Sequence, residues 1–316
     1  MEEIAYSGVI EAVCISEAKG TVKHPVEQVV LVANFGLEGD AHAGTWHRQV
    51  SLLDSGKVAA FNARGGKAAV GDFGENILVS GIDLAKLPVG SILCAGEVVL
   101  RLSQIGKECH SHCQIYKRVG DCIMPREGVF ATVEQGGVLR AGMTLNVTLP
   151  AADAAFRAAV LTLSDKGSTG ERVDTSGPRA AQLLTEAGYE VVEQVLLPDE
   201  QRLIERELVR LADSRQVDLI ITTGGTGFSL RDVTPEATMA VATRNAPGIA
   251  EAIRAESLKI TPRAMLSRGA SVLRNRTLIV NLPGSKKAVE EGLAIILPQL
   301  EHGLRILRGS AHDCAR

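Results

Sequence analysis

The spacing of apolar residues along this 316-residue chain follows one pattern up to residue 149 and another from residue 157, and this change limits the folds that the chain can adopt. Up to residue 149, short apolar runs alternate with glycine-rich turns, and only residues 55–65 have a clearly helical pattern. From residue 157 onward, apolar strand-like runs alternate with helical segments. The stretch 150–156 is made mostly of small residues and follows neither pattern. It is therefore interpreted as a linker between two domains, 1–149 and 157–316.

The N-terminal domain is predicted to be mostly β. Its apolar runs at 26–33, 91–102 and 143–149 are short and are separated by turns rich in glycine. Such a pattern favours a compact β-barrel or sandwich.

The C-terminal domain is predicted to be a doubly wound α/β fold around a parallel sheet. Apolar runs alternate along the chain with segments of helical periodicity, because parallel strands need crossover connections. The expected strands are 158–164, 189–197, 217–223 and 277–282, and the expected helices are 176–187, 199–214, 235–244, 247–258 and 286–307. In such folds a ligand binds beyond the carboxyl ends of the strands.

Composition excludes several classes of protein. The net charge is −3 and aromatic residues make up only 3% of the chain, which argues against binding to nucleic acid by bulk charge or base stacking. No apolar run reaches the ~18 residues of a membrane helix, so we expect no membrane partner. The acidic start of the chain lacks the apolar segment of a signal peptide, so we expect a cytoplasmic protein.

A glycine-rich loop, Thr223-Gly224-Gly225-Thr226-Gly227, directly follows the predicted strand 217–223. Glycines there allow a close approach of the backbone to an anion, and their N–H groups can form a concave nest of donors. The loop has neither the dinucleotide-binding pattern nor the Walker pattern. By itself it is also compatible with a tight turn that binds no ligand.

Two aspartates follow predicted strands near this loop. Asp199 ends the strand 189–197, and Asp232 stands just before Thr234 and Pro235, which have the pattern of an N-cap and a first helical residue. Each aspartate could simply stabilise a helix N-terminus. Alternatively, the two carboxylates could share one Mg²⁺ beside the glycine loop.

Two further loops lie at the same predicted edge of the sheet. Asn281, Pro283, Gly284, Ser285 and Lys286 connect the strand 277–282 to the last helix, and a helix N-terminus that carries Ser and Lys is suited to bind an anion. Ser164 and Asp165 close the first strand and begin a long polar loop.

These segments together resemble the molybdopterin-binding domain of MogA/MoaB-type proteins, a family that includes the gephyrin G domain. The matching segments are 161–165, 196–200, 222–238 and 281–287, and the resemblance covers residues 157–309. It implies a trimeric α/β domain that adenylylates molybdopterin with Mg-ATP and releases pyrophosphate. It also implies that Asp199 and Asp232 are the catalytic pair and that the two glycine-containing loops hold substrate.

The chemistry agrees with these residue types. A phosphate monoester is already an oxyanion, so its attack on the α-phosphorus of ATP needs neutralised charge and alignment more than a strong base. A metal held by Asp199 and Asp232 would bridge the triphosphate, and Lys286 or an arginine could assist the departing pyrophosphate.

The N-terminal domain carries three cysteines and two histidines within residues 109–122. The spacing of Cys109, Cys113 and Cys122 lacks the paired knuckles that are typical of zinc sites, although a histidine could complete such a site. Buried thiols that act as small hydrophobes are a second alternative. The third is a reactive thiol or soft ligand, whose pKa nearby Lys and Arg side chains would lower.

The N-terminal domain resembles a MOSC domain, the C-terminal module of molybdenum-cofactor sulfurases. The matching segments are 36–42, 71–77, 87–90 and the cysteine stretch. The resemblance implies a β-barrel that binds molybdenum cofactor, or carries sulfur to it, through a cysteine. Cys113 is our candidate, with Cys109 and Cys122 as possible thiol partners. His42, Trp46 and His47 are predicted either to line the same pocket or to form a surface loop.

Three hypotheses follow. The first is a bifunctional enzyme that matures the molybdenum cofactor, supplied with sulfur by a separate cysteine desulfurase and delivering to cofactor-insertion proteins. The second is a non-catalytic carrier or chaperone of molybdopterin. The third is a scaffold protein that binds stoichiometric zinc at Cys109, Cys113 and Cys122.

Overall fold

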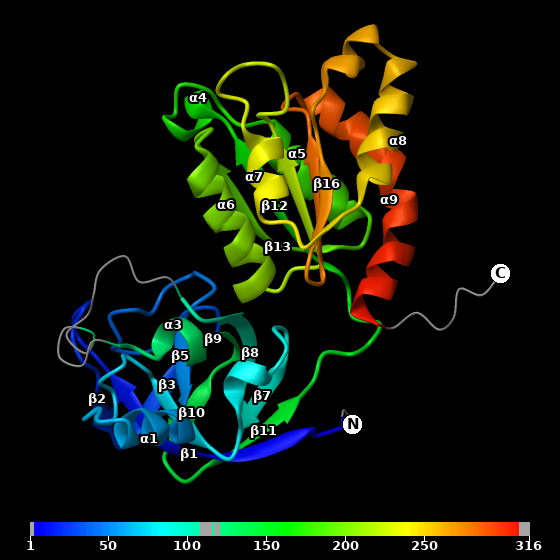
Figure 1. The fold of residues 1–316 in the computed structure, drawn as a ribbon. Coiled ribbons are helices and arrows are strands. Elements are labelled where there is room, and N and C mark those ends of the chain that lie inside the picture. The colour runs from blue at the N-terminus through cyan, green and yellow to red at the C-terminus, as the bar shows by residue number, and fades with distance from the viewer. Residues whose placement is uncertain (1–2, 108–115, 117–120, 310–316) are drawn as a thin grey trace. The chain divides into compact units, whose positions relative to one another are not determined.

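The computed structural model describes residues 3–107, 116 and 121–309. The chain forms two compact units, Met1–Ala151 and Ala152–Arg316 (Figure 1). Each described helix is either too short or too polar to span a bilayer.

The N-terminal unit is a β-barrel, which confirms the predicted class. Its sheet has the order β11-β7-β8-β9-β5-β6-β1-β2, and pairing of β1 with β11 closes the barrel and leaves β2 outside the ring. The strands of this sheet are β1 (Tyr6–Ile15), β2 (His24–Val26), β5 (Val50–Asp54), β6 (Ile77–Ser80), β7 (Ile92–Ala95), β8 (Val98–Ile105), β9 (Val129–Gln135) and β11 (Thr144–Thr148). A second sheet contains β10 (Gly137–Arg140), β3 (Gln28–Val32) and β4 (Gly36–Leu37).

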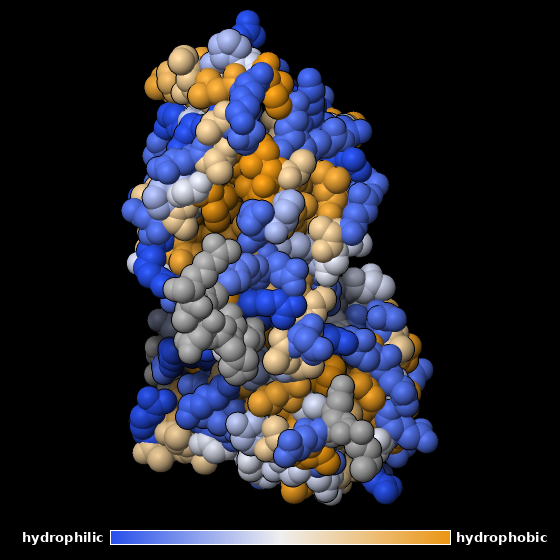
Figure 2. Space-filling view, turned by 90° about the vertical axis from the view of Figure 1, so that its right-hand side faces the viewer, coloured by the Kyte–Doolittle hydropathy of each residue, from blue (hydrophilic) through white to orange (hydrophobic). Residues whose placement is uncertain are grey.

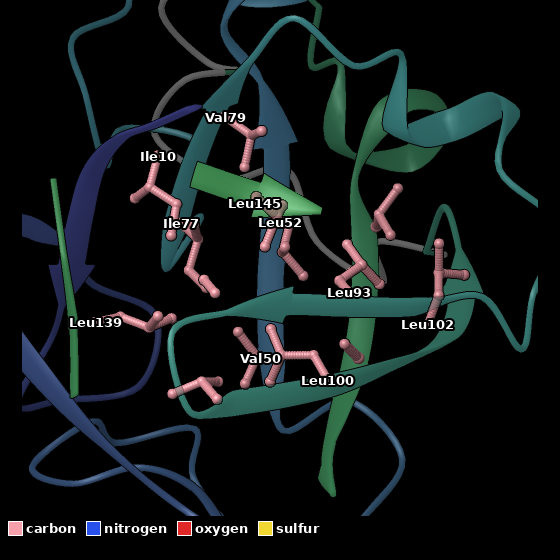
Figure 3. Close-up of a cluster of buried hydrophobic side chains, with 14 of the residues drawn as sticks. Ile10, Val50, Leu52, Ile77, Val79, Leu93, Leu100, Leu102, Leu139 and Leu145 are labelled. Carbon is pink, nitrogen blue, oxygen red and sulfur yellow. The ribbon is translucent and has the colours of Figure 1, made fainter. Parts of the chain in front are cut away.

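The barrel interior is packed with aliphatic side chains, as the low aromatic content requires. Ile10, Leu52, Ile77, Leu93 and Leu100 are fully or almost fully buried and point toward one another from different strands (Figure 3). The predicted helix 55–65 is α1 (Ser55–Ala63), and the structure adds the short helices η1 (Leu84–Lys86) and α3 (Met124–Glu127).

The C-terminal unit is a sheet of order β13-β12-β14-β17-β16-β15 that has helices on both faces. Its strands are β12 (Arg157–Leu163), β13 (Glu190–Leu197), β14 (Leu219–Thr223), β15 (Arg244–Asn245), β16 (Ser271–Arg274) and β17 (Thr277–Leu282). Its helices are α4 (Asp165–Ser168), α5 (Ser176–Glu186), α6 (Gln201–Val209), η2 (Arg210–Ser214), α7 (Thr234–Ala240), α8 (Pro247–Leu258), η3 (Pro262–Leu266) and α9 (Lys286–Arg308).

The central strands are mostly apolar because both of their faces are buried, and their polar residues lie mainly toward the strand ends. In β12, Ala158 and Val160 pack toward α5, α8 and α9, whereas Ala159 and Leu161 pack toward α6 and α7. Figure 1 shows α6 and α7 on one side of the sheet and α8 and α9 on the other.

The predicted α/β class with a mostly parallel sheet is confirmed, but one edge of the sheet is antiparallel. Strands β12, β13, β14 and β17 are parallel, but β16 pairs antiparallel with β17, and β15 pairs antiparallel with β16. Both antiparallel strands were absent from the predicted elements because they are short, with two and four residues. The predicted helix 199–214 begins two residues later, at Gln201, and ends in the π-helical turn η2.

Candidate functional site

The glycine loop passes between the carboxyl ends of three strands. Gly224 and Gly225 have φ values of 102° and 61°, which lie in the left-handed region that favours glycine. A Cβ on Gly224 would come within 2.2 Å of the Leu163 carbonyl oxygen, and the Gly224 N–H donates to the Leu282 carbonyl over 3.1 Å. The backbone therefore follows a path here that a side chain would block.

The structure brings the glycine loop into contact with the loop after β17. Thr223 Oγ1 donates to the Pro283 carbonyl over 3.0 Å. A Cβ on Gly284 would lie 3.1 Å from the Gly224 Cα. Two motifs that are 60 residues apart in sequence thus form one surface.

A pocket of about 280 Å³ opens on one side of these loops. Of the residues that the sequence analysis assigned to substrate, Ser164, Thr223, Gly284 and Ser285 line it. Ser164 Oγ accepts from the Gly167 N–H and Ser285 Oγ accepts from the Ala288 N–H, so each hydroxyl proton stays available to a ligand. The N-terminus of the long helix α9 begins directly after Ser285, which suits this pocket to an anionic group.

The opposite wall of the pocket comes from residues 172–176, which the sequence analysis described only as part of a polar loop. Asp174 Oδ1 accepts from the Ser176 N–H, the Ser176 hydroxyl and the Gly177 N–H. Burial alone would raise the pKa of Asp174, but hydrogen bonds from Gly177, Thr162 and Ser176 lower it overall. The Asp-x-Ser-Gly pattern before a predicted helix is the signal that could have revealed this wall.

Lys286 is exposed at the first position of α9. A cation at a helix N-terminus opposes the helix dipole, so this lysine does not serve to stabilise α9. Its placement beside the pocket suits the binding of an anion.

The other side of the glycine loop is acidic. Asp165 and Asp199 cap one another's backbone: the Asp165 N–H donates to Asp199 Oδ2 and the Asp199 N–H donates to Asp165 Oδ1, each over 3.0 Å. Arg231 forks onto both oxygens of Asp165 over 3.0 and 2.8 Å and also reaches Glu200 over 2.9 Å. The hydrogen bonds from Arg231 hold the pKa of Asp165 below its usual value.

Asp199 keeps one carboxylate oxygen uncommitted. Its Oδ1 is buried without a hydrogen-bond partner and lies 2.9 Å from where a Cβ on Gly225 would stand. Burial raises the pKa of Asp199, as do the nearby carboxylates of Asp165 and Asp232. An orphaned anionic oxygen in such surroundings suits a cation.

Asp232 faces the same loop from the segment that precedes α7. Its Oδ2 accepts from the Ser229 N–H over 2.9 Å and lies 2.9 Å from where a Cβ on Gly227 would stand. Glycine at 225 and 227 therefore leaves room for both carboxylates against the loop. Within the described residues no cluster of three or more His, Cys, Asp or Glu side chains could hold a metal, but two carboxylates plus substrate phosphates suffice for Mg²⁺.

Two predictions of local structure were wrong. Glu200 is the N-cap of α6 and forms no side-chain cap, so Asp199 does not cap this helix. Val233 is the N-cap of α7, whereas Thr234 is the first residue inside the helix and donates from Oγ1 to the Gly224 carbonyl. Thr234 thus ties α7 to the glycine loop.

Asn281 and Thr226 serve the scaffold of the site. Asn281 is 3% exposed, and its amide donates to Thr222 and Thr238 while its oxygen accepts from the Ala270 N–H. Thr226 is 6% exposed. Both residues therefore position the loops.

In the N-terminal unit, Cys109 and Cys113 lie outside the described residues, so the zinc hypothesis stays a prediction. Cys122 is 6% exposed and packs in an apolar cluster with Phe61 and Met124. This is the behaviour of a small hydrophobe.

The predicted histidine loop is compact. Trp46 Nε1 donates to the His42 carbonyl over 3.0 Å, and His47 Nε2 lies 2.8 Å from Gln104 Oε1, two residues before Gly106. The Arg48 guanidinium stacks 4.6 Å from the centre of the Trp46 ring.

The segment 36–42 contains Asp40, which forms a buried ion pair with Lys23. Asp40 pairs with Lys23 and accepts from the Ser16 and His42 N–H groups and from Asn76 Nδ2. Burial by itself would raise the pKa of Asp40, but hydrogen bonds from His42 and Lys23 lower it overall. The Lys23 and Asp40 side chains are only 2% and 1% exposed.

Lys23→Met should destabilise the N-terminal unit by about 3–5 kcal/mol, because Asp40 would remain buried without its counter-ion. Trp46, the single tryptophan, reports unfolding of this unit by fluorescence in urea. Exposed Lys19→Met is the matched control. Equal midpoints for both variants would show that the pair does not stabilise the barrel.

A sheet with a glycine loop, a helix N-terminus and carboxylates at its carboxyl edge is typical of α/β proteins that bind phosphorylated ligands. Comparison with known proteins narrows this class. The model of the "Probable molybdopterin binding domain" family matches residues 159–302, and that of the MOSC domain matches residues 39–146.

The curated relatives agree. The chain is 40% identical over 153 residues to the molybdopterin adenylyltransferase of Helicobacter pylori strain J99, covering 48% of this chain and 87% of that protein. It is 44% identical over 141 residues to the Escherichia coli K12 enzyme of the same name, covering 44% and 72%. Among solved structures, the molybdopterin biosynthesis enzyme MoaB of Thermus thermophilus shares 47% identity, with 49% of this chain and 97% of that chain covered and a TM-score of 0.47.

The chain therefore belongs, through its C-terminal unit, to the molybdopterin-binding family of these adenylyltransferases, and its N-terminal unit carries a MOSC domain.

Proposed function

We propose that the C-terminal unit transfers the adenylyl group of ATP to the terminal phosphate of molybdopterin. A phosphate oxygen of molybdopterin forms a bond to the α-phosphorus of ATP, the bond from that phosphorus to the bridging oxygen breaks, and pyrophosphate leaves. The observation that carries this proposal is the orphaned, buried Oδ1 of Asp199, which faces the same glycine loop as Asp232.

The two sides of the loop take different parts of the substrates. The pocket side, lined by Ser164, Thr223, Gly284 and Ser285, supplies the hydroxyl donors of Ser164 and Ser285 and the α9 N-terminus for an anionic group. The acidic side, with Asp199 and Asp232, would hold Mg²⁺, which neutralises triphosphate charge when it is bound. In this proposal Lys286, exposed at the start of α9, would neutralise charge on the departing pyrophosphate.

The remaining residues of the site act on its shape. Gly224, Gly225 and Gly227 let phosphate oxygens approach the backbone, while Pro283, Asn281 and Thr226 fix the loops. Asp165 holds Asp199 in register and receives the Arg231 guanidinium. No residue is required as a strong base, because the attacking phosphate is already ionised.

The direct test is pyrophosphate release by the full chain with Mg-ATP and molybdopterin. Turnover supports an adenylyltransferase. Tight molybdopterin binding with no turnover would overturn this function in favour of a molybdopterin carrier.

For the N-terminal unit, we propose binding of the molybdenum cofactor or sulfur transfer to it through Cys113, with Cys109 as a possible thiol partner. Because Cys122 is buried in an apolar cluster, we place it outside the reactive set. The persulfide would come from a separate cysteine desulfurase, and the product would pass to cofactor-insertion proteins.

Cys113→Ser should abolish persulfide formation when the chain is incubated with a cysteine desulfurase and cysteine, because this substitution removes the proposed acceptor sulfur. Cys122→Ser should still form the persulfide, since the Cys122 thiol is shielded from solvent. Mass spectrometry of the cysteine-containing peptides measures the persulfide in both variants. Persulfide on Cys113→Ser at the level of the unchanged chain would exclude Cys113 as the acceptor.

Stoichiometric zinc in the purified protein would instead favour a zinc-binding scaffold.

We also propose a homo-trimer formed through the C-terminal unit. Apolar side chains of this unit are exposed at the end of α8 and in η3, where Ile260 is 53% and Met265 is 68% exposed. Figure 2 shows apolar side chains gathered in patches among polar ones on the face drawn there. Such patches are typical of protein contact surfaces.

A further inference from the structure

Arg268 lies between η3 and β16 and binds both ends of the turn that carries Asp232. Its Nε donates to the Gly227 carbonyl over 2.7 Å, and its Nη2 donates to the Asp232 carbonyl. Its own backbone N–H donates to the Thr226 carbonyl over 3.0 Å. The third guanidinium nitrogen, Nη1, forms an ion pair with Glu236 in α7.

The tip of the turn packs poorly, and Arg268 restrains its two ends in addition to the contacts of Arg231 with Asp165 and Glu200. Phe228 is 68% exposed and Leu230 is 99% exposed. The Asp232 N–H donates to the Ser229 carbonyl and the Ser229 N–H donates to Asp232 Oδ2, but both contacts stay within the turn. Segments with few buried contacts open easily unless tertiary contacts restrain them.

The geometry of Arg268 bears directly on where the Asp232 carboxylate stands. Gly227 and Asp232 begin and end the turn, and one planar guanidinium fixes the spacing of their carbonyls. Asp232 Oδ2 in turn lies close against Gly227. Loss of the guanidinium would free the Gly227 and Asp232 carbonyls, while Arg231 would still tether the turn to Asp165 and Glu200. The Asp232 carboxylate would then shift relative to Asp199.

We propose that Arg268 is a positioning residue that holds Asp232 in the geometry needed to share a divalent cation with Asp199. Its donors are directed at backbone carbonyls and at Glu236, so it acts through Asp232 and not on the substrate. A lysine could pair with Glu236 but could not bridge the two carbonyls at the same time. The inference rests on the proposed function for its kinetic readout, and on cation binding for an independent one.

The experiment compares the full chain with Arg268→Ala, Arg268→Lys and the control Arg263→Ala, an exposed arginine in η3. The kcat for pyrophosphate release should fall about 10- to 100-fold in Arg268→Ala, since small displacements of catalytic groups have effects of this size. The Mg²⁺ concentration for half-maximal rate should rise, while the Kd for molybdopterin stays unchanged. Arg268→Lys should remain close to Arg268→Ala, and added methylguanidinium should restore part of the rate.

Mn²⁺ binding, followed by electron paramagnetic resonance without substrates, provides the second readout. Arg268→Ala should bind Mn²⁺ more weakly than Arg263→Ala. Equal Mn²⁺ affinity of these two variants would overturn the inference even if the unchanged chain proves inactive, so its failure is distinct from failure of the proposed function. Full activity of Arg268→Lys would also overturn it, because charge alone would then suffice. If Arg268→Ala does not fold, Arg268→Lys carries both measurements.

Discussion

Asp232→Ala and Asp232→Asn are expected to release pyrophosphate about 100- to 1000-fold more slowly than the unchanged chain, the usual loss when one preorganised electrostatic group is removed from a reacting site. Asp232 and Asp199 face one glycine loop, and each carboxylate lies where only glycine fits. Asparagine matches the shape of aspartate but not its charge, so the Asn variant isolates the cation-binding role.

The measurement is steady-state pyrophosphate release with Mg-ATP and molybdopterin, together with the Kd for molybdopterin by calorimetry. The rate should fall while molybdopterin still binds, because the pocket residues lie on the other side of the loop. Exposed Asp153→Asn is the matched control. If Asp232→Asn turns over like Asp153→Asn, Asp232 is not catalytic and the shared cation site is wrong.

The parts of the fold that sequence reasoning predicted are those in which one signal dominates. Strands β12, β14 and β17 are buried on both faces, so their apolar runs are continuous and easy to recognise. Strand β16 spans only Ser271–Arg274, and half of its residues are only partly buried. Its place in the sheet comes from pairing with β17, which no local pattern encodes.

The same distinction applies to the site. Asp199, Asp232 and the glycine loop could be predicted because each directly follows a strand or a loop of recognisable composition. Arg268 could not, because its contacts reach residues 36 and 41 positions away in the chain. The wall at 172–176 lies between these cases: its Asp-x-Ser-Gly pattern is visible in the sequence, but its place in the pocket depends on the packing of α5 beside β12.

Asp199→Asn is expected to slow pyrophosphate release as Asp232→Asn does, and also to make the cation-free C-terminal unit more stable. In the folded chain Asp199 is half-buried, its Oδ1 is buried without a hydrogen-bond partner, and its carboxylate lies near those of Asp165 and Asp232. Asparagine can still accept the Asp165 N–H bond, but it brings no negative charge. In the proposed function, the charge that lets Asp199 bind a cation also lowers the stability of the cation-free unit.

The sign of the pH dependence follows from the raised pKa of Asp199. The Asp199 carboxyl group holds its proton more tightly in the folded chain than in the unfolded chain, where its pKa has the ordinary value of about 3.9. As pH rises from the ordinary pKa through the raised folded pKa, this group increasingly lowers the free energy of unfolding. The advantage of Asp199→Asn should therefore be absent well below pH ~4 and complete above the folded pKa, including at neutral pH.

Hydrogen exchange of the β14 amides in EDTA reports the stability of this unit apart from that of the barrel. Addition of Mg²⁺ at 100 times its Kd should raise the free energy of unfolding of the unchanged chain by about 2.7 kcal/mol, because only a folded state that binds the cation is stabilised by it. The free energy of unfolding of Asp199→Asn should not change. Equal protection of both chains in EDTA would show that the carboxylate costs no stability. If Mg²⁺ stabilises Asp199→Asn as much as the unchanged chain, the cation binds elsewhere. The unpartnered Oδ1 would then give no support to a catalytic role of Asp199.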